Sequence, residues 1–122
     1  MKRILSFLAI QLMLMMSLEA SGADIPYLSG RVNDYANILS PETRRMLSDT
    51  LKAHEDRTGN QVVVLTLSTL GGENIEDFSN KVFNEWKLGQ KGKDNGILIV
   101  VVPDDRSMRI EVGYGLEGAL PD

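Results

Sequence analysis

Residues 91–122, KGKDNGILIVVVPDDRSMRIEVGYGLEGALPD, carry the strongest structural pattern in the chain. Residues 97–102 form an unbroken apolar run rich in β-branched side chains, which is typical of a strand covered on both faces. Residues 108–112 alternate between apolar and polar side chains, and this period of two predicts a half-buried strand. The short turn between the two strands makes them an antiparallel hairpin.

Two helices and another buried strand are predicted before this hairpin. Ser40-Pro41-Glu42 is typical of a helix start, and Gly59 of its end. Residues 62–65 form a second apolar run, which predicts a strand. A second helix has its apolar residues at helical spacing and stops at Gly89. Those apolar residues are Ile75, Phe78, Val82 and Trp86.

These elements predict an α/β fold with a mixed sheet. The strand at 61–68, the helix after it and the strand at 97–102 form a βαβ unit, so the two strands are expected to be parallel with a right-handed crossover. The strand at 108–112 adds an antiparallel neighbour. Residues 24–30 are expected to be an extended lead-in, and residues 32–36 a short ordered connector.

The first 23 residues have the pattern of a secretory signal peptide. Lys2 and Arg3 precede a mostly apolar run of about 15 residues, which is shorter than the roughly 20 that a spanning helix needs. Small residues at 20–23 place cleavage after Gly22 or after Ala23. The protein is therefore expected to be exported to the periplasm or cell envelope, with residues 24–122 as one domain.

Composition excludes several classes of function. Once Lys2, Arg3 and Glu19 are removed, the 13 basic and 17 acidic residues fall to 11 and 16, a net charge of −5 with His54 neutral. An acidic domain is a poor partner for nucleic acid, because neutralising phosphates needs a basic face. The chain has no cysteine, so disulfides and thiol chemistry are excluded.

Acidic and amide side chains gather at one predicted end of the sheet. Hard divalent cations prefer oxygen ligands, so these side chains are candidate ligands for Ca²⁺ or Mg²⁺. For Asp94 and Asn95 the alternative is a simple turn, and for Asp34 it is capping of the backbone in the connector. The full candidate set is Asp34, Asp94, Asn95, Glu111, Glu117 and Asp122.

The glycine-rich loop after the last strand is a second candidate site. It is predicted at the same end of the sheet as Asp94, and its glycines would let the backbone approach a ligand closely. The spacing matches neither a phosphate loop nor a dinucleotide fingerprint, and a tight structural loop is the alternative. The candidate residues of this loop are Gly113, Tyr114, Gly115 and Gly118.

Four sequence blocks together resemble the TPM domain. They cover nearly all of residues 24–122 and are VNDYANILS at 32–40, TG at 58–59, GQKGKDNG at 89–96 and RIEVGYGLEG at 109–118. The resemblance implies a three-layer α/β/α sandwich whose remaining helices follow Asp122, so the fold is expected to be truncated at its C-terminus. Bacterial relatives often carry a later transmembrane segment, which implies a membrane anchor beyond residue 122.

The resemblance leaves two classes of function open. Some members of the family are acid phosphatases or bind divalent cations, and others are non-enzymatic assembly, repair or accessory factors. The first hypothesis is therefore a binding module for membrane or assembly partners in the envelope, with a bound Ca²⁺ or Mg²⁺ as an option. The second is a metal-assisted phosphatase acting on a phosphate-bearing ligand. No catalytic residues are assigned.

Overall fold

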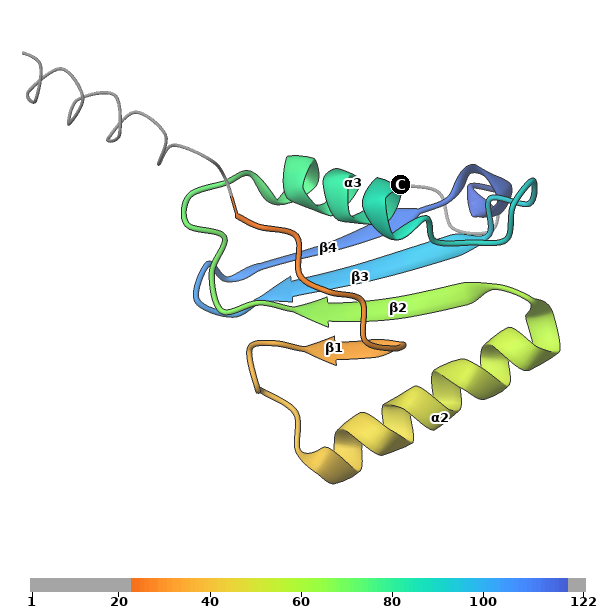
Figure 1. Cartoon of the computed structure of the whole chain (residues 1–122), viewed down its shortest axis with the longest axis horizontal. Coiled ribbons are helices and arrows are strands. Elements are labelled where there is room, and N and C mark those ends of the chain that lie inside the picture. Colours follow the sequence, from red (N-terminus) through yellow and green to blue (C-terminus); the bar gives the residue numbers. More distant parts are fainter. Residues whose placement is uncertain (1–22, 119–122) are drawn as a thin grey trace, which may run out of the picture.

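The computed structural model describes residues 23–118, in which a four-stranded mixed sheet carries two helices (Figure 1). The sheet order is β1-β2-β3-β4, with β1, β2 and β3 parallel and β4 antiparallel to β3. The α/β fold with a mixed sheet is thus confirmed. In chain order the elements are β1 (Val32–Asp34), α2 (Pro41–Thr58), β2 (Gln61–Thr66), α3 (Ile75–Trp86), β3 (Gly96–Val102), β4 (Ser107–Val112) and the 3₁₀ turn η1 (Tyr114–Leu116).

One strand was missed in the sequence. Residues 32–34 form β1, a parallel edge strand beside β2, where only a connector is expected. Three residues are too few for an alternating pattern to show. The strand forms because Val32 pairs with Val64 and Asp34 with Thr66, so its partner rather than its own pattern decides its structure.

Both ends of α2 and the start of α3 follow local sequence signals, but α3 ends at Trp86 with Lys87 as its left-handed cap, before the predicted stop at Gly89. The Ser40 side chain accepts a hydrogen bond from the Thr43 N–H, and Pro41 occupies the first turn of α2. Gly59 adopts the left-handed conformation with φ of 80° and donates its N–H to the Glu55 carbonyl, ending α2 as a C-terminal glycine. α3 is capped by the Asn74 side chain, which accepts from the N–H groups of Glu76 and Asp77.

The core lies between α3 and one face of the sheet. Val63, Leu65, Leu98 and Val100 share that face, and Phe78 from α3 is fully buried against them. Burying each such side chain contributes roughly 1.5–3 kcal/mol relative to exposure, so this layer dominates the stability of the domain.

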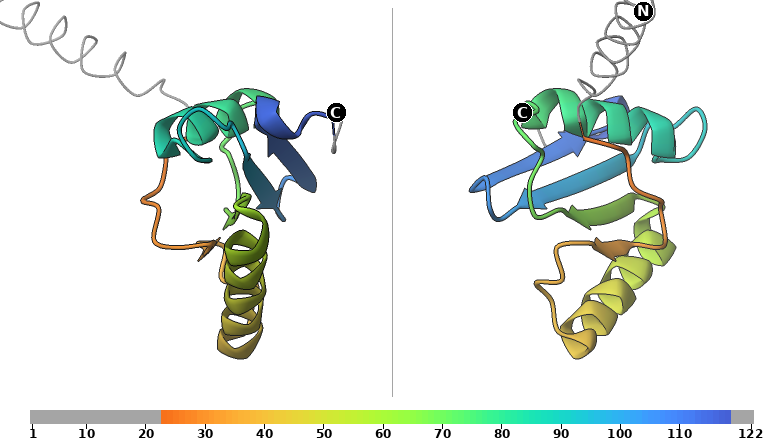
Figure 2. Two further views of the ribbon diagram at one scale, coloured as in Figure 1. Left: turned by 90° about the vertical axis from the view of Figure 1, so that its right-hand side faces the viewer. Right: turned by 60° about the vertical axis from the view of Figure 1, so that its left-hand side comes forward.

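α2 is held less tightly than α3. It contacts β1 and β2, whereas α3 contacts β4 and β3, so the two helices flank the sheet at opposite ends of the strand order (Figures 1 and 2). No residue of α2 is buried, and Leu47 and Leu51 are only half-buried. Neither helix within residues 23–118 is long and apolar enough to cross a membrane.

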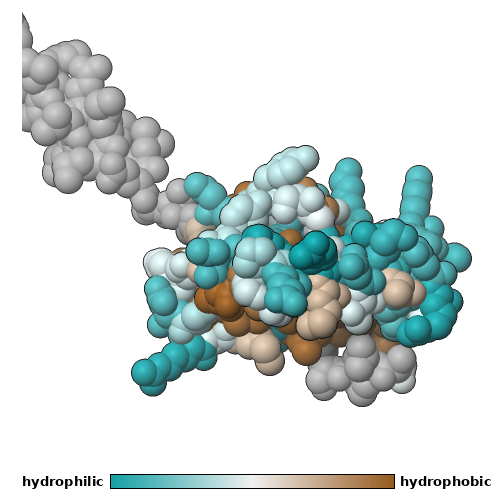
Figure 3. All heavy atoms as spheres, turned by 90° about the horizontal axis from the view of Figure 1, so that it is seen from below, coloured by the Kyte–Doolittle hydropathy of each residue, from teal (hydrophilic) through white to brown (hydrophobic). Residues whose placement is uncertain are grey.

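Part of the apolar surface stays accessible on the sheet. Met108 and Ile110 of β4 are 65% and 45% exposed, and they pair with Val101 and Ile99 of β3. Seen from the α2 side, hydrophobic atoms are visible between the hydrophilic side chains that cover most of the molecule (Figure 3). Among residues 23–118, no helix covers this face of β3 and β4 as α3 covers the other face.

The lead-in before β1 is anchored by one buried amide. Asn33 Oδ1 accepts hydrogen bonds from the Ser29 N–H at 2.8 Å and the Gly30 N–H at 3.3 Å. Its Nδ2 donates to the carbonyl oxygens of Gly30 at 2.9 Å and Val64 at 3.1 Å. With the side chain only 1% exposed, the amide joins the lead-in to β2 across β1.

Replacing Asn33 by Asp tests this anchor. Asn33→Asp keeps the shape, removes both N–H donors and places a carboxylate against two carbonyl oxygens. We expect a loss of about 3 kcal/mol in the free energy of unfolding, measured by urea denaturation. Asn80→Asp, the same change at an exposed position of α3, should cost less than about 0.5 kcal/mol. Equal losses in the two variants would contradict the anchor.

Candidate functional site

The polar side of β4, rather than its apolar side, faces the covering helix. Arg109 pairs with Val100 and Glu111 with Leu98, so both charged residues lie on the face that packs against α3. They are half-buried, whereas Met108 and Ile110 on the other side are exposed. β4 is half-buried as expected, but with its charged residues toward the helix.

α3 presents a matching polar side to β4, and the two elements enclose a groove of about 910 Å³. One wall comes from α3, another from β4, and the end from the loops around Asp94 and Tyr114. Five acidic and two basic side chains line the groove, which gives it a formal charge of −3. These charged residues are Glu76, Asp77, Lys81, Asp94, Arg109, Glu111 and Glu117.

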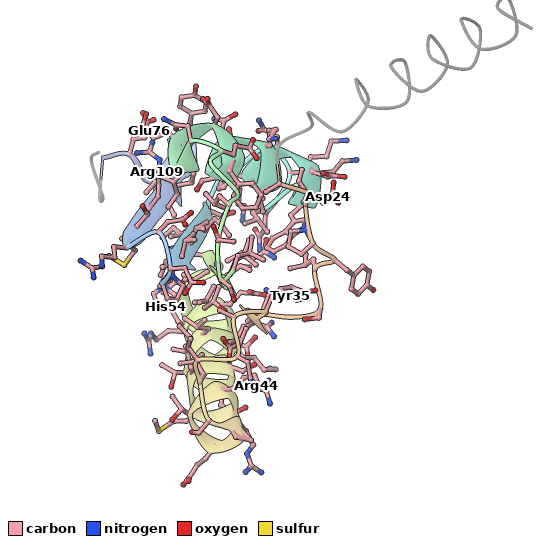
Figure 4. All side chains as sticks on the ribbon, turned by 90° about the vertical axis from the view of Figure 1, so that its left-hand side faces the viewer. Asp24, Tyr35, Arg44, His54, Glu76 and Arg109 are labelled. Atoms are coloured by element: carbon pink, nitrogen blue, oxygen red, sulfur yellow. The ribbon has the colours of Figure 1, made fainter. Side chains whose placement is uncertain are left out.

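One of the ion pairs of Arg109 connects the two walls of the groove. Arg109 Nε lies 3.0 Å from Glu111 Oε1 on the same strand, and Arg109 Nη1 lies 3.9 Å from Glu76 Oε1 on α3. Figure 4 shows Glu76 and Arg109 side by side where α3 meets β4. Lys81 is also engaged, with its Nζ 2.5 Å from Glu73 Oε1. Both basic side chains of the groove therefore already contact carboxylates.

Asn95 is built into the scaffold. Its Oδ1 accepts the Gln90 N–H at 2.7 Å, and its Nδ2 donates to the Gly59 carbonyl at 2.8 Å. The residue is 7% exposed. The predicted ligand oxygen of Asn95 is thus used to join the loop after α3 to the C-terminal end of α2.

The glycine loop packs on the loop that contains Asp94. Gly113 N–H donates to the Gly96 carbonyl at 2.8 Å, and Gly115 N–H donates to the Asp94 carbonyl at 2.9 Å. A Cβ atom on Gly113 would lie 2.3 Å from the Asp94 carbonyl oxygen. The close approach that these glycines permit is therefore to the chain's own backbone, and a ligand role for the loop stays a prediction.

Asp34 lies at the opposite end of the sheet from Asp94. It ends β1 and pairs with Thr66, which pairs with Val101 near the end of β3, whereas Asp94 precedes β3. The hypothesis that Asp34 joins Asp94 in one site is therefore wrong, because parallel strands bring like ends together.

The Asp34 carboxylate is occupied by the turn that follows β1. It accepts hydrogen bonds from the Thr66 hydroxyl at 2.7 Å, the Leu39 N–H at 2.9 Å and the Ile38 N–H at 3.1 Å. Burial raises the pKa of Asp34, but these hydrogen bonds together with the Arg44 charge outweigh it and hold the pKa below its ordinary value.

The groove brings together part of the predicted site and adds residues that the sequence analysis missed. Asp94, Glu111, Glu117, Gly113 and Tyr114 all line it, while Asp122 lies outside the described residues. The residues that the sequence analysis missed are Arg109 of β4 and the polar side of α3. Helical spacing could have found the α3 residues, because they share one side of the helix: Glu76, Asp77, Asn80, Lys81 and Asn84.

The described residues show no cluster of three ionisable ligands for a divalent ion. Within residues 23–118 no group of three or more His, Cys, Asp or Glu side chains is placed so that it could hold a metal ion. Asn95, one of the predicted ligands, is committed to backbone contacts, and Asp34 is at the other end of the sheet. A role of Asp94, Glu111 and Glu117 in holding Ca²⁺ or Mg²⁺ therefore stays a prediction.

The sequence profile of the TPM domain matches residues 32–122, which include every element of the groove. The chain belongs to the TPM domain family. None of the curated proteins compared with this TPM domain matches it.

Two solved structures resemble this TPM domain. The solution NMR structure of the N-terminal domain of a protein from P. gingivalis is 39% identical with a TM-score of 0.70, and the match covers 77% of this chain and 60% of that chain. The solution NMR structure of the N-terminal domain of the cg2496 protein from Corynebacterium glutamicum is 18% identical with a TM-score of 0.60. That match covers 76% of this chain and 60% of that chain. The second likeness shows the fold alone. The match spans about 60% of the length of both structures.

Adding a methyl group to Gly113 tests the loop contact in the TPM domain. Gly113→Ala forces apart the backbones at Gly113 and Asp94, and we expect it to cost about 1–3 kcal/mol in urea denaturation. Gly118→Ala is the matched control, because a Cβ there meets nothing within 4 Å. The contact would be unimportant to stability if the two variants unfolded at the same urea concentration.

The pKa of Asp34 predicts a pH-dependent contribution to stability. Since the folded pKa lies below the unfolded value of 3.8, the contribution is present above that value and is lost as the pH falls through the folded pKa. Asp34→Asn should lower the free energy of unfolding by about 1–3 kcal/mol at pH 7. The difference in the free energy of unfolding between Asp34→Asn and wild type should become smaller below about pH 4. A difference that is constant from about pH 7 to about pH 2.5 would contradict this role.

Proposed function

We propose that this TPM domain is an exported binding module of the cell envelope, and that the groove between α3 and β4 receives a positively charged segment of a membrane or assembly partner. The observation that carries the proposal is the charge of the groove, where five carboxylates meet two basic side chains. The N-terminal pattern of Lys2, Arg3 and an apolar run supports export.

A concave surface lined mainly by one sign of charge attracts the opposite sign. Such a groove focuses the electrostatic field and speeds the association of oppositely charged partners. The formal charge of −3 already includes Arg109 and Lys81, which contact the carboxylates of Glu111 and Glu73 respectively. Lysine or arginine side chains of a partner would therefore find net attraction and carboxylate acceptors on both walls.

The phosphatase alternative has one observation in its favour. Arg109 lies in the same groove as Asp94, so a cationic clamp and a carboxylate face the same space. Two features argue against it. Arg109 is held by Glu111 and Glu76, and a groove with a formal charge of −3 repels a phosphomonoester dianion. We therefore place the binding module first.

Amide NMR titrations of the exported protein distinguish these functions. The probes are a hexalysine peptide, inorganic phosphate, and Ca²⁺ or Mg²⁺ alone. We expect hexalysine to shift the amides of Asp77, Asp94, Glu111 and Glu117, with affinity that falls as salt rises. Asp77→Asn combined with Glu117→Gln should weaken binding about three- to tenfold, since exposed charge pairs contribute roughly 0.2–1 kcal/mol each.

The control carries the same charge change far from the groove. Glu42→Gln with Asp49→Asn removes two carboxylates from α2, and Glu42, like Asp77, lies in the first turn of its helix. Equal weakening in the two double variants would overturn recognition by the groove. Saturable shifts at Arg109 with phosphate alone would favour the phosphatase, and saturable shifts around Asp94 with Ca²⁺ or Mg²⁺ would show an ion site that residues 23–118 do not display.

A further inference from the structure

The backbone nitrogen of Ala23 contacts the side-chain carboxylate of Glu73. Ala23 N–H donates to Glu73 Oε2 at 2.7 Å, although the two residues are 50 positions apart in the chain. The other oxygen, Glu73 Oε1, lies 2.5 Å from Lys81 Nζ. The Glu73 side chain is 14% exposed, and Lys81 and Ala23 together hold the pKa of this carboxyl below its usual range.

The lead-in positions Ala23 at this carboxylate through several independent contacts. Ala23, Ile25 and Leu28 pack against the hydrophobic core, while Asp24 and Tyr27 point outward. Further along, the Trp86 indole N–H donates to the Pro26 carbonyl at 3.0 Å. Asn33 then fixes the end of the lead-in. The lead-in is thus held by described contacts from Ala23 to Asn33, and Figure 4 shows Asp24 on the other side of α3 from Glu76 and Arg109.

The sequence by itself allows two cleavage positions for the signal peptide. Ala20 and Gly22 supply small residues for cleavage after Gly22, and Ser21 and Ala23 supply them for cleavage after Ala23. The structure separates these two products. Cleavage after Gly22 keeps Ala23 in its packed position, whereas cleavage after Ala23 removes both its core contact and the group that meets Glu73.

We propose that the chain is processed between Gly22 and Ala23, and that the α-ammonium group released at Ala23 docks on the Glu73 carboxylate. A leader-removing peptidase adds one water across this peptide bond. The carbonyl of Gly22 takes the hydroxyl and becomes a carboxylate, and the nitrogen of Ala23 becomes an amine that binds a proton near neutral pH. Processing therefore converts a neutral amide donor into a cation at a site already holding an acceptor.

The product of cleavage is a better partner for Glu73 than the uncleaved amide. A charge-assisted hydrogen bond is roughly twice as strong as a neutral one, and the partly buried setting screens it little. The charged groups that meet here are Glu73 on the loop before α3, Lys81 on α3 and the new terminus of the lead-in. Glu73 Oε2 would bind the α-ammonium group of Ala23 while Oε1 binds Lys81 Nζ, so one carboxylate joins the lead-in to α3.

This inference rests on the export that the proposed function includes, but not on the groove. A groove that binds no cationic peptide would leave the N-terminus unaffected. Conversely, a terminus at another residue would leave the charge of the groove as it is. The two proposals can therefore fail separately.

The experiment starts from the whole chain, expressed with its own leader in a secreting bacterium. Intact mass and N-terminal sequencing of the exported protein should identify Ala23 as the first residue. Competitive acylation at a series of pH values then gives the pKa of the α-amine. We expect a value above the ordinary range of about 7.7–8.0, because the carboxylate favours the protonated amine.

The variants assign the effect to Glu73. Glu73→Gln should return the α-amine pKa to its ordinary range, and Glu85→Gln, the same change at an exposed position of α3, should leave it raised. If Glu73→Gln does not fold, the salt dependence of the wild-type protein provides the test. Added salt should lower the pKa of the α-amine if a nearby carboxylate has raised it. A terminus other than Ala23, or an α-amine pKa within the ordinary range at low salt, overturns the proposal.

Discussion

The side chain of Asn95 is the constraint on which the arrangement of the sheet ends depends. Its side-chain amide bonds Gly59 at the end of α2 and Gln90 in the loop after α3, and the backbone carbonyl of Asn95 accepts the Gln61 N–H at the start of β2. The connection from α2 to β2 and the connection from α3 to β3 are thus held together at one buried residue. An unsatisfied buried amide costs about 1–3 kcal/mol, so the loops cannot separate from it cheaply.

The close loop contact beside Asn95 extends this arrangement to β4. Gly113 and Gly115 press against Asp94 and Gly96, and the pairing of Val112 with Ile97 follows from that position. The register then puts Arg109 and Glu111 under α3, because neighbouring residues of a strand point to opposite faces. The polar groove is therefore a consequence of where the glycine loop closes, and a shift of one residue would place Met108 and Ile110 there instead.

Much of the fold could be predicted because its signals are local. The apolar runs of β2 and β3 and the Ser40-Pro41 and Gly59 ends of α2 each depend on a few adjacent residues. The antiparallel direction of β4 was predicted, but the side of the strand that faces α3 was not, because only the packing of α3 decides which side is covered. Asp34 was misplaced for a similar reason: its partner Thr66 lies 32 positions away. The groove was predicted only in part, because the polar residues of α3 have the pattern of any solvent-exposed helix face.

The blocks that identify the family explain the scaffold better than they explain recognition. Asn95, Gly96, Gly113 and Gly115 lie in the KDNG and GYG segments and make the contacts that close the sheet end. Glu76, Asp77 and Lys81, which give one wall of the groove its charge, lie outside those blocks. The other three carboxylates of the groove, Asp94, Glu111 and Glu117, lie inside the blocks at 89–96 and 109–118. Membership of a fold family does not by itself establish what a site binds. For this chain the net negative charge of the groove, rather than the glycines of the loop, is the feature that indicates the ligand.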